Sequence, residues 1–374
     1  MLESKRNTTY KFLLFLFQFI FIILLLIAFV VFFNYSIDAS HVINAKTHKA
    51  MAKLALAGNV VAVPENYNER IFQLAIIENM RIIPETIVVG SSRGMFLGKD
   101  ITGYTNLYNH CVSGACIEDY YAILGLYFQK YKKMPSRVII EISPWIFYEH
   151  NIETRWLENY SYRSACERFY KTINGKNIEK EGKKKENPYF SISYFQYNFS
   201  YLKENGIKSF LSSPARISND DSEAADNPDG TIRYKAILEK AGLGRLAKVQ
   251  AYRGAVVNQG VHRMKEIDSK KKLDFENLIY YLLKNNVEII IYLEPFSVTQ
   301  CRFSFDNNMN PIFRTVEKYC RDFSKANNLK FIGGYDARKY NISDNSFINS
   351  MHLDKTGTAV VWSTDYNKIT QDFN

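Results

Sequence analysis

The chain has 374 residues, of which 47% are hydrophobic and 15% aromatic, and it carries a formal net charge of +10. This composition excludes an intrinsically disordered or fibrous protein and suffices for one large folded domain with attachments. The most lysine-rich stretch, residues 176–185, is interrupted by Glu179 and Glu181 and is typical of a solvated loop. No basic–aromatic motif accompanies it, so nucleic acid is not expected as a partner.

An apolar run near the N-terminus predicts a membrane-spanning helix. Residues 12–33 contain one polar side chain, Gln18, and about 20 apolar residues suffice for a helix to cross a bilayer. A cleaved signal peptide has a shorter apolar region, of about 7–15 residues. Basic residues precede the run at Lys5, Arg6 and Lys11. Because positive charge stays inside, we predict a single-pass protein of the cytoplasmic (inner) membrane, with residues 1–11 cytoplasmic and the C-terminal domain extracytoplasmic or periplasmic.

Residues 34–82 are predicted to connect this span to the main domain. Apolar residues recur with helical spacing over residues 46–56 and again over residues 68–80. We interpret this region as a short stalk followed by a helix that packs on the edge of the domain.

From residue 83 onward, short apolar strands alternate with amphipathic helices. Strands are predicted over residues 86–89, 106–109, 137–142, 287–293 and 330–332. Helices are predicted over residues 117–131, 273–284, 311–326 and 356–369. This alternation is typical of the α/β class, and we predict a three-layer domain with a doubly wound, five-stranded parallel sheet over residues 83–374.

The third and fourth predicted strands are separated by a long stretch, residues 145–270, that is rich in Tyr, Phe, Ser and Lys. A plain crossover is much shorter, so the stretch is interpreted as an inserted cap or substrate-binding subdomain. Within it, the sequence Asn227-Pro228-Asp229-Gly230 predicts a turn.

Cysteine spacing indicates no metal centre. The five cysteines are Cys111, Cys116, Cys166, Cys301 and Cys320. The first two lie five positions apart, which is not the spacing of a CxxC redox or zinc site. The set is interpreted as core or disulfide cysteines, with one or two disulfides possible, and neither a metal nor another cofactor is expected.

Two small motifs are expected to meet at one edge of the sheet. The first predicted strand ends at Gly90, and Ser91, Ser92 and Arg93 follow at once. A serine at this place is either a helix cap or a nucleophile, and the local sequence alone favours the cap. His352 follows the last predicted strand, so it should lie at the same carboxyl edge. A serine beside a histidine favours acyl transfer, because the imidazole can take the serine proton.

These motifs resemble those of the SGNH/GDSL hydrolase superfamily. Gly90-Ser91-Ser92-Arg93 resembles its first motif, and Gly114, in the loop after the second predicted strand, resembles its glycine motif. The C-terminal histidine motif is resembled by His352, Leu353 and Gly357. The resemblance covers residues 84–374, and the closest branch is the membrane-anchored one with the teichoic-acid D-alanyl transfer protein and polysaccharide O-acetylation proteins.

The resemblance implies a membrane-anchored, extracytoplasmic serine esterase or O-acyltransferase acting on acyl or acetyl esters of a cell-surface glycan or envelope polymer. It implies Ser92 as the nucleophile and His352 as the base, with the backbone N–H groups of Ser92 and Gly114 forming the oxyanion hole. Ser91 would support the turn. Arg93 would either pair with an acidic substrate group or brace the helix start, and Asn109 is a further candidate for substrate binding or support.

Two departures from the family pattern keep a second hypothesis open. The family's Asp three residues before the histidine is Asn349 here, which can orient an imidazole but cannot balance the charge of an imidazolium. Asp344 and Asp354 are the candidates to replace it. Residues 141–145 also lack the family's Asn oxyanion donor. The second hypothesis is a catalytically degenerate accessory or binding protein of the same fold that assists a membrane-bound O-acyltransferase.

Overall fold

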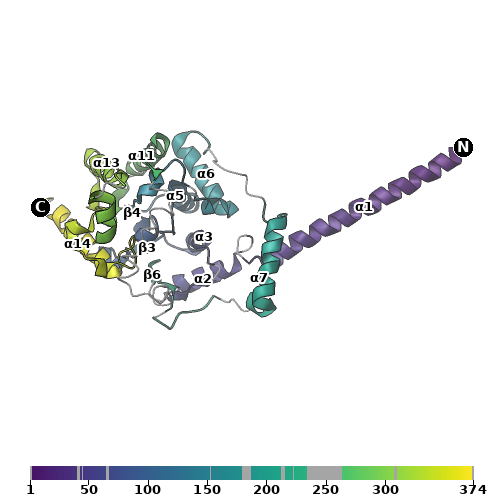
Figure 1. Ribbon diagram of the computed structural model, residues 1–374, viewed down its shortest axis with the longest axis horizontal. Coiled ribbons are helices and arrows are strands. Elements are labelled where there is room, and N and C mark those ends of the chain that lie inside the picture. Colours follow the sequence, from purple (N-terminus) through teal and green to yellow (C-terminus); the bar gives the residue numbers. More distant parts are fainter. Residues whose placement is uncertain are drawn as a thin grey trace. The chain divides into compact units, whose positions relative to one another are not determined.

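A computed structural model describes residues 2–39, 43, 45–64, 67–151, 153–178, 187–211, 215–221, 223–233, 263–306 and 310–372 (Figure 1). The chain divides into two compact units. The anchor unit comprises Met1–Thr47, Pro64–Asn68 and Glu181–Pro214, and the α/β unit comprises His48–Val63, Glu69–Lys180 and Ala215–Asn374. This division differs from the predicted boundaries, because residues 48–63 and 69–82 belong to the α/β unit and part of the predicted insertion belongs with the N-terminal helix.

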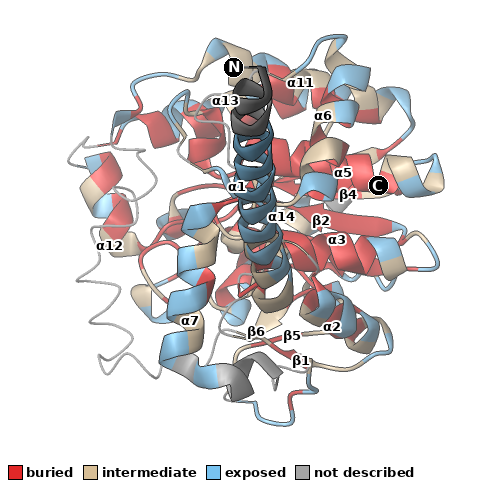
Figure 2. Ribbon diagram, turned by 90° about the vertical axis from the view of Figure 1, so that its right-hand side faces the viewer, coloured by how far each residue is buried: buried red, intermediate tan, exposed pale blue. Residues whose placement is uncertain are grey.

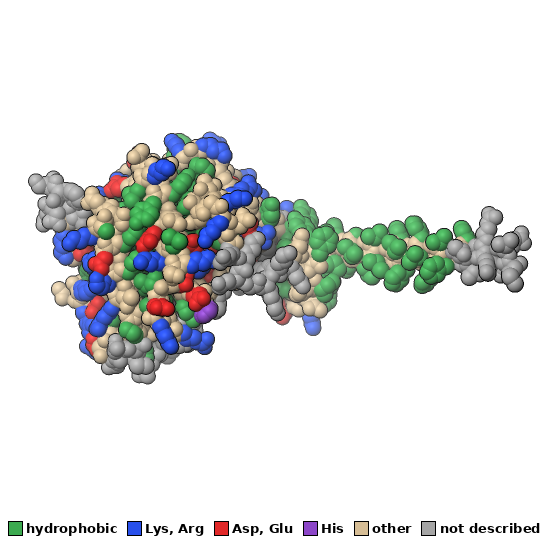
Figure 3. All heavy atoms as spheres, turned by 90° about the horizontal axis from the view of Figure 1, so that it is seen from above, with side chains coloured by type: hydrophobic (Ala, Val, Ile, Leu, Met, Phe, Trp, Pro, Cys, Tyr) green, Lys and Arg blue, Asp and Glu red, His purple; other side chains and the backbone are tan. Residues whose placement is uncertain are grey.

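The anchor unit is built on one long apolar helix, α1 (Leu2–Ile37). Within it, Tyr10–Ile37 is long and apolar enough to cross a membrane, and it includes the predicted span of residues 12–33. Figure 3 shows hydrophobic side chains along the visible face of this helix. The second helix of the unit is α7 (Ile192–Leu211), which is interrupted at Gly206, where φ is +72°.

The predicted stalk is folded into the α/β unit. Helices α2 (Lys46–Leu56) and α3 (Glu69–Asn79) agree with the predicted ranges. Eight consecutive residues of α3, Arg70–Ile77, are buried, and the guanidinium of Arg70 lies 2.7 Å from the carboxylate of Asp119. A helix buried to this extent is part of the core of the α/β unit, whereas the sequence predicts this helix on the edge of the domain.

A five-stranded parallel sheet forms the centre of the α/β unit, as predicted. Its strands are β2 (Thr86–Val89), β3 (Leu107–Asn109), β4 (Arg137–Glu141), β7 (Glu288–Leu293) and β8 (Lys330–Gly333). The order is β3-β2-β4-β7-β8, with all neighbours parallel. The chain therefore reverses its direction of travel across the sheet between β3 and β4, and the topological switch point lies at the carboxyl ends of β2 and β4.

Helices cover both faces of this sheet. The connecting helices are α4 (Lys99–Thr102), α5 (Ile117–Tyr131), α11 (Ser269–Lys284), α12 (Val298–Cys301), α13 (Ile312–Ala326) and α14 (Lys355–Asp372). Short 3-10 turns are η1 (Ser92–Gly94), η2 (Pro144–Phe147), η3 (Arg155–Leu157), η6 (Ala337–Tyr340) and η7 (Asp344–Ser346), and η5 (Arg302–Asp306) is a π-helical turn.

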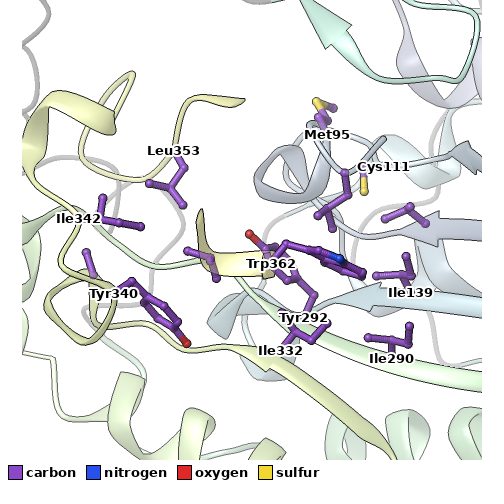
Figure 4. Packing of buried hydrophobic residues seen from close by; sticks show 14 of the residues in the cluster. Met95, Cys111, Ile139, Ile290, Tyr292, Ile332, Tyr340, Ile342, Leu353 and Trp362 are labelled. Carbon is purple, nitrogen blue, oxygen red and sulfur yellow. The ribbon is translucent and has the colours of Figure 1, made fainter. Parts of the chain in front are cut away.

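Alternate residues of the strands face opposite layers. On one face, Ile139, Ile290 and Ile332 form a buried cluster with Trp362 of α14, as Figure 4 shows. On the other face, α11 and α13 pack on β7, and the rings of Phe275 and Phe323 lie 5.9 Å apart between those helices. β-Branched strand residues that are buried on both sides explain why the sequence reads as continuous apolar runs.

The predicted insertion is not one compact cap in the part that the structure describes. Helix α6 (Tyr160–Asn174) packs along α5 in the helical layer, whereas α7 belongs to the anchor unit. Strands β5 (Ala225–Asp226) and β6 (Ile232–Arg233) join β1 (Val61–Ala62) in a small antiparallel sheet. Residues 152, 179–186, 212–214, 222 and 234–262 of the insertion lie outside the described residues, and they include positions 179–185 of the lysine-rich stretch.

The turn predicted at residues 227–230 is formed, and it covers the free edge of β3. The N–H of Asn109 donates to the carbonyl of Asp229 over 2.8 Å. Gly230 has a φ of +80°, and a Cβ at this position would lie 2.1 Å from the Asn109 carbonyl oxygen, so the close approach requires glycine. At the other edge, Asp365 of α14 accepts the N–H of Gly333 in β8.

The five cysteines are all buried and all unpaired. The disulfide alternative is therefore wrong for this structure, and the core interpretation holds. Burial raises the pKa of Cys111, Cys116 and Cys166 well above the ordinary thiol value, which makes them poor nucleophiles.

Candidate functional site

The strand β2 ends in a turn that the neighbouring strand shapes. A Cβ on Gly90 would lie 2.5 Å from Cβ of Glu141, the last residue of β4, so only glycine fits there. The carboxylate of Glu141 accepts the N–H of Ser91 over 2.7 Å. The Ser91 hydroxyl contacts the hydroxyl of Ser143 and accepts the N–H of Arg93. Ser91 is therefore the cap of η1 and supports the turn, as predicted.

Because Ser91 supplies the cap, the hydroxyl of Ser92 is available for another contact. Ser92 is the first residue of η1 and is half-buried. Its Oγ lies 2.7 Å from Nε2 of His352, 260 positions further along the chain. The structure thus brings together the two residues that the sequence places at one edge of the sheet, next to the topological switch point.

Asn349 fixes the orientation and the tautomer of the imidazole. Its side-chain oxygen accepts the Nδ1–H of His352 over 2.9 Å, and it also accepts the backbone N–H groups of His352 and Met351. An amide oxygen is an acceptor only, so Nδ1 carries the proton and Nε2 presents its lone pair to the Ser92 hydroxyl. This is the tautomer that a general base requires.

The two other acidic candidates have different partners. Asp344 accepts the backbone N–H and the hydroxyl of Thr299 at the start of α12. Asp354 accepts the N–H of Gly357 in the first turn of α14. The acceptor of the imidazole Nδ1–H is Asn349.

Arg93 braces the site from behind, which favours the second of its two predicted roles. The side chain is fully buried, and its guanidinium lies 3.7 Å from the Glu141 carboxylate and 3.8 Å from the ring centre of Phe296. It donates to the carbonyl of Met351 over 2.9 Å and to the carbonyl of Glu294. A fully buried guanidinium with these partners positions the protein's own backbone.

The histidine loop is held on both sides of His352. On one side, Arg93 binds the carbonyl of Met351. On the other side, the buried carboxyl group of Glu294 accepts the N–H of Leu353 over 3.0 Å. Burial raises the pKa of Glu294 well above the ordinary value of a glutamate. Arg93 follows the end of β2 and Glu294 follows the end of β7. The sheet therefore fixes the position of the imidazole, together with the loop that carries it.

Sequence reasoning did not identify Glu141 and Glu294 as part of this cluster. A signal for both was present, because each is a carboxylate that follows at least three apolar strand residues at the carboxyl edge of the sheet. Their partners come from other strand ends, so only the assembled sheet shows what they bind.

Asn109 is buried and supports the turn. Its amide nitrogen donates to the carbonyls of Gly94 and Leu97, and its oxygen accepts the N–H of Cys111. Gly114 lies in a buried turn before α5 with a φ of +62°. Among the described residues, no acceptor is found for the backbone N–H of Ser92 or of Gly114. A donor in an oxyanion hole needs an N–H group that is not already bound in this way.

The imidazoles of His110 and His352 are both held neutral. Burial, together with the nearby Arg93 guanidinium, lowers the pKa of His352 from 6.5 to about 3. Burial also lowers the pKa of His110 from 6.5 to about 3. His110 has a structural role, because its two ring nitrogens bond to the side chains of Gln73 and Tyr127.

We expect the free energy of unfolding to fall as the pH is lowered below about 6.5. In that range the unfolded chain takes up a proton on His110 and the folded chain does not, so stability is full above pH 6.5 and decreases toward pH 3. The slope for this one residue approaches about 1.4 kcal/mol per pH unit. Urea unfolding at pH 7, 6, 5 and 4 measures it. The variant His110→Gln should show a shallower slope, and identical slopes would contradict the assignment.

The cluster around Ser92 is separate from other surface features. A hollow on the outer side of α13 is lined by Thr315, Lys318, Tyr319, Asp322, Phe323 and Ala326 and shares no residue with it. Within the described ranges, no group of three or more His, Cys, Asp or Glu side chains is arranged to hold a metal ion.

In comparisons with known proteins, no family model and no curated protein matches the sequence of this chain.

Proposed function

We propose that this chain is a membrane-anchored serine esterase or O-acyltransferase that works through an acyl-enzyme on Ser92. The observation that carries the proposal is the row of contacts from Ser92 Oγ to His352 Nε2 and from His352 Nδ1 to Asn349, at 2.7 and 2.9 Å. A hydroxyl, a neutral imidazole with its lone pair on Nε2 and an acceptor that fixes the tautomer are the groups that nucleophilic acyl transfer uses.

The chemistry follows from these positions. Ser92 Oγ attacks the carbonyl carbon of an ester while Nε2 of His352 takes the hydroxyl proton. The tetrahedral intermediate then expels the alcohol, which receives that proton, and the acyl group stays on Ser92. Water or a second hydroxyl attacks the acyl-enzyme, His352 again takes the proton, and the Ser92 hydroxyl is restored. Water as the acceptor makes an esterase, and a glycan hydroxyl makes a transferase.

The negative charge of the intermediate needs donors at a fixed place. The backbone N–H groups of Ser92 and Gly114 are the proposed oxyanion hole, and each such donor typically contributes about 3–4 kcal/mol to the rate. Asn109 is not available as a third donor, because both of its amide hydrogen bonds are made to Gly94 and Leu97. The proposed hole therefore has two donors.

The cellular setting of the proposal rests on α1 and on the resemblance of the Ser, Gly and His motifs to the SGNH/GDSL superfamily. The apolar segment Tyr10–Ile37 is suited to a single-pass anchor. With the basic residues before the span on the cytoplasmic side, the α/β unit would be extracytoplasmic. The membrane-anchored branch of the superfamily then suggests acyl or acetyl esters of a cell-surface glycan or envelope polymer as substrates.

A specific observation favours a second candidate function. Asn349 cannot balance the charge of an imidazolium, and the pKa of His352 is lowered to about 3, so the imidazole is a weak base. A chain with this site could instead bind an acylated polymer without turning it over and assist a membrane-bound O-acyltransferase. The two candidates share the fold and the anchor and differ in whether Ser92 becomes acylated.

A fluorophosphonate probe separates the two. The probe forms a covalent bond from phosphorus to a reactive serine oxygen and releases fluoride. We expect the full-length protein in detergent micelles to be labelled, and we expect Ser92→Ala to abolish the label. Ser363→Ala, at an exposed position of α14, is the matched control and should be labelled like the wild type. Absence of label on wild-type protein that unfolds cooperatively would overturn the acyl-enzyme proposal in favour of the binding protein.

A further inference from the structure

Helix α7 has an apolar arc that is wider than its contact with α1 requires. Phe195, on the side facing α1, packs in tilted contacts against the rings of Phe29 and Phe33 of that helix. Ile192 and Phe199, seven positions apart, lie on the flank of the same arc, and their side chains are 58% and 57% exposed. Phe190, just before the helix, is 61% exposed. Figure 2 shows exposed residues along α7.

The opposite arc of α7 is mostly polar. Its exposed residues are Ser193, Gln196, Tyr197, Ser200 and Glu204, and Lys203 lies at the border with the apolar arc. A helix with one polar side and one apolar side that a neighbour covers only in part is amphipathic beyond the needs of its own packing. Exposed apolar residues scattered singly need no explanation, but here they adjoin a helix that is apolar all round.

The structure holds α7 at the end of the apolar segment. The Phe195 ring lies 4.6 Å from that of Phe33 and 6.0 Å from that of Phe29, and both phenylalanines belong to the segment Tyr10–Ile37. The side-chain amide of Asn34 donates to the carbonyls of Pro188, Tyr189 and Ser191, which lead into α7. Helix α7 is thus tied to the last turns of α1 by both ring contacts and hydrogen bonds.

In Figure 1, α7 runs across the end of α1 and not along it. If α1 crosses a bilayer, α7 then lies along the bilayer surface at the level of Phe29 to Asn34. At this level, apolar side chains meet the boundary between acyl chains and headgroups, about 5–10 Å into the interface.

We infer that α7 is an interfacial helix that inserts Phe190, Ile192 and Phe199 into the lipid surface beside the end of α1. This inference rests on the proposed membrane anchor. The polar arc faces headgroups and water, and Lys203 is long enough to reach a lipid phosphate. The lipid occupant is favoured over a protein partner because the arc adjoins a helix that is suited to lie in lipid, through the contacts of Phe195 with Phe29 and Phe33.

Trp fluorescence in nanodiscs tests the inference with the full-length chain. We would compare Phe199→Trp and Ile192→Trp on the apolar arc with Ser200→Trp on the polar arc. The native Trp145, Trp156 and Trp362 are buried in the α/β unit and provide a constant background. With lipids brominated high in the acyl chain, we expect loss of the added fluorescence for the two apolar-arc variants and none for Ser200→Trp.

A further variant, Leu24→Trp, reports on the anchor itself with lipids brominated deep in the acyl chain. Quenching of Leu24→Trp without quenching at positions 192 and 199 would overturn the interfacial helix and leave the anchor in place. Absence of quenching at Leu24 would overturn the anchor. Blue-shifted but unquenched fluorescence at both apolar-arc positions would mean that protein, either a second copy or another chain, covers the arc.

Discussion

Replacing Asn349 with aspartate is expected to increase the rate of covalent labelling of Ser92 by about two orders of magnitude. In the serine-protease template, the reverse change lowers turnover about 10⁴-fold. A carboxylate beside Nδ1 stabilises the imidazolium that forms as Ser92 loses its proton. The side-chain oxygen of Asn349 accepts three N–H groups, and its amide nitrogen has no part in these contacts. An aspartate carboxylate can therefore accept the same three N–H groups.

The same variant should change the pH dependence of the reaction. The added carboxylate raises the pKa of His352. As the pH is lowered, the labelling rate of Asn349→Asp should therefore begin to fall at a higher pH than the labelling rate of the wild type. Asn345→Asp, an exposed position four residues away in sequence from Asn349, adds the same charge without the contact and is the matched control. Asn349→Ala removes the tautomer-fixing acceptor and should label more slowly. Equal rates for the wild type and Asn349→Asp would contradict this role.

Replacing Arg93 with methionine is expected to lower the free energy of unfolding by about 3–5 kcal/mol, because it leaves the Glu141 carboxylate buried without its charged partner. It should also abolish labelling of Ser92, since the carbonyls of Met351 and Glu294 lose the donor that fixes the histidine loop. Denaturant unfolding and fluorophosphonate labelling measure the two effects.

The control is Arg216→Met, which removes a guanidinium that is 60% exposed and paired with Glu223. An exposed ion pair contributes about 0–1 kcal/mol, so this variant should be nearly as stable as the wild type. The double variant Arg93→Met with Glu141→Gln should lose less than the sum of the single losses, because the second change removes the uncompensated charge. Loss of less than 1 kcal/mol from Arg93→Met, with labelling at the wild-type rate, would refute the bracing role.

The sheet and the meeting of Ser92 with His352 could be predicted because both follow from local signals and one general rule. Each strand is predicted by its own apolar or β-branched run, and the carboxyl ends of parallel strands lie at one edge of the sheet. Two residues that follow strand ends are therefore expected at the same edge of the sheet, whatever the length of chain between them.

The supporting network could not be predicted in the same way. Arg93, Glu141 and Glu294 come from the ends of three different strands, and their pairing depends on the order of strands in the sheet. Helix α6 is a different kind of omission, because its buried residues recur with helical spacing in the sequence. They are Tyr162, Ala165, Cys166, Phe169 and Tyr170. This helical spacing is visible in the sequence, but the polar residues between these positions make the segment resemble a loop.

The turn at residues 227–230 has a consequence for the behaviour of the protein in solution. An open edge strand is a template onto which another chain can add a strand, and this is a common route to aggregation. At β3, the backbone donor of Asn109 is already bound by Asp229, and Gly230 fills the space beside it. A second copy that approaches this edge meets a closed turn in place of an open ladder, so removal of the turn would expose the sheet to self-association.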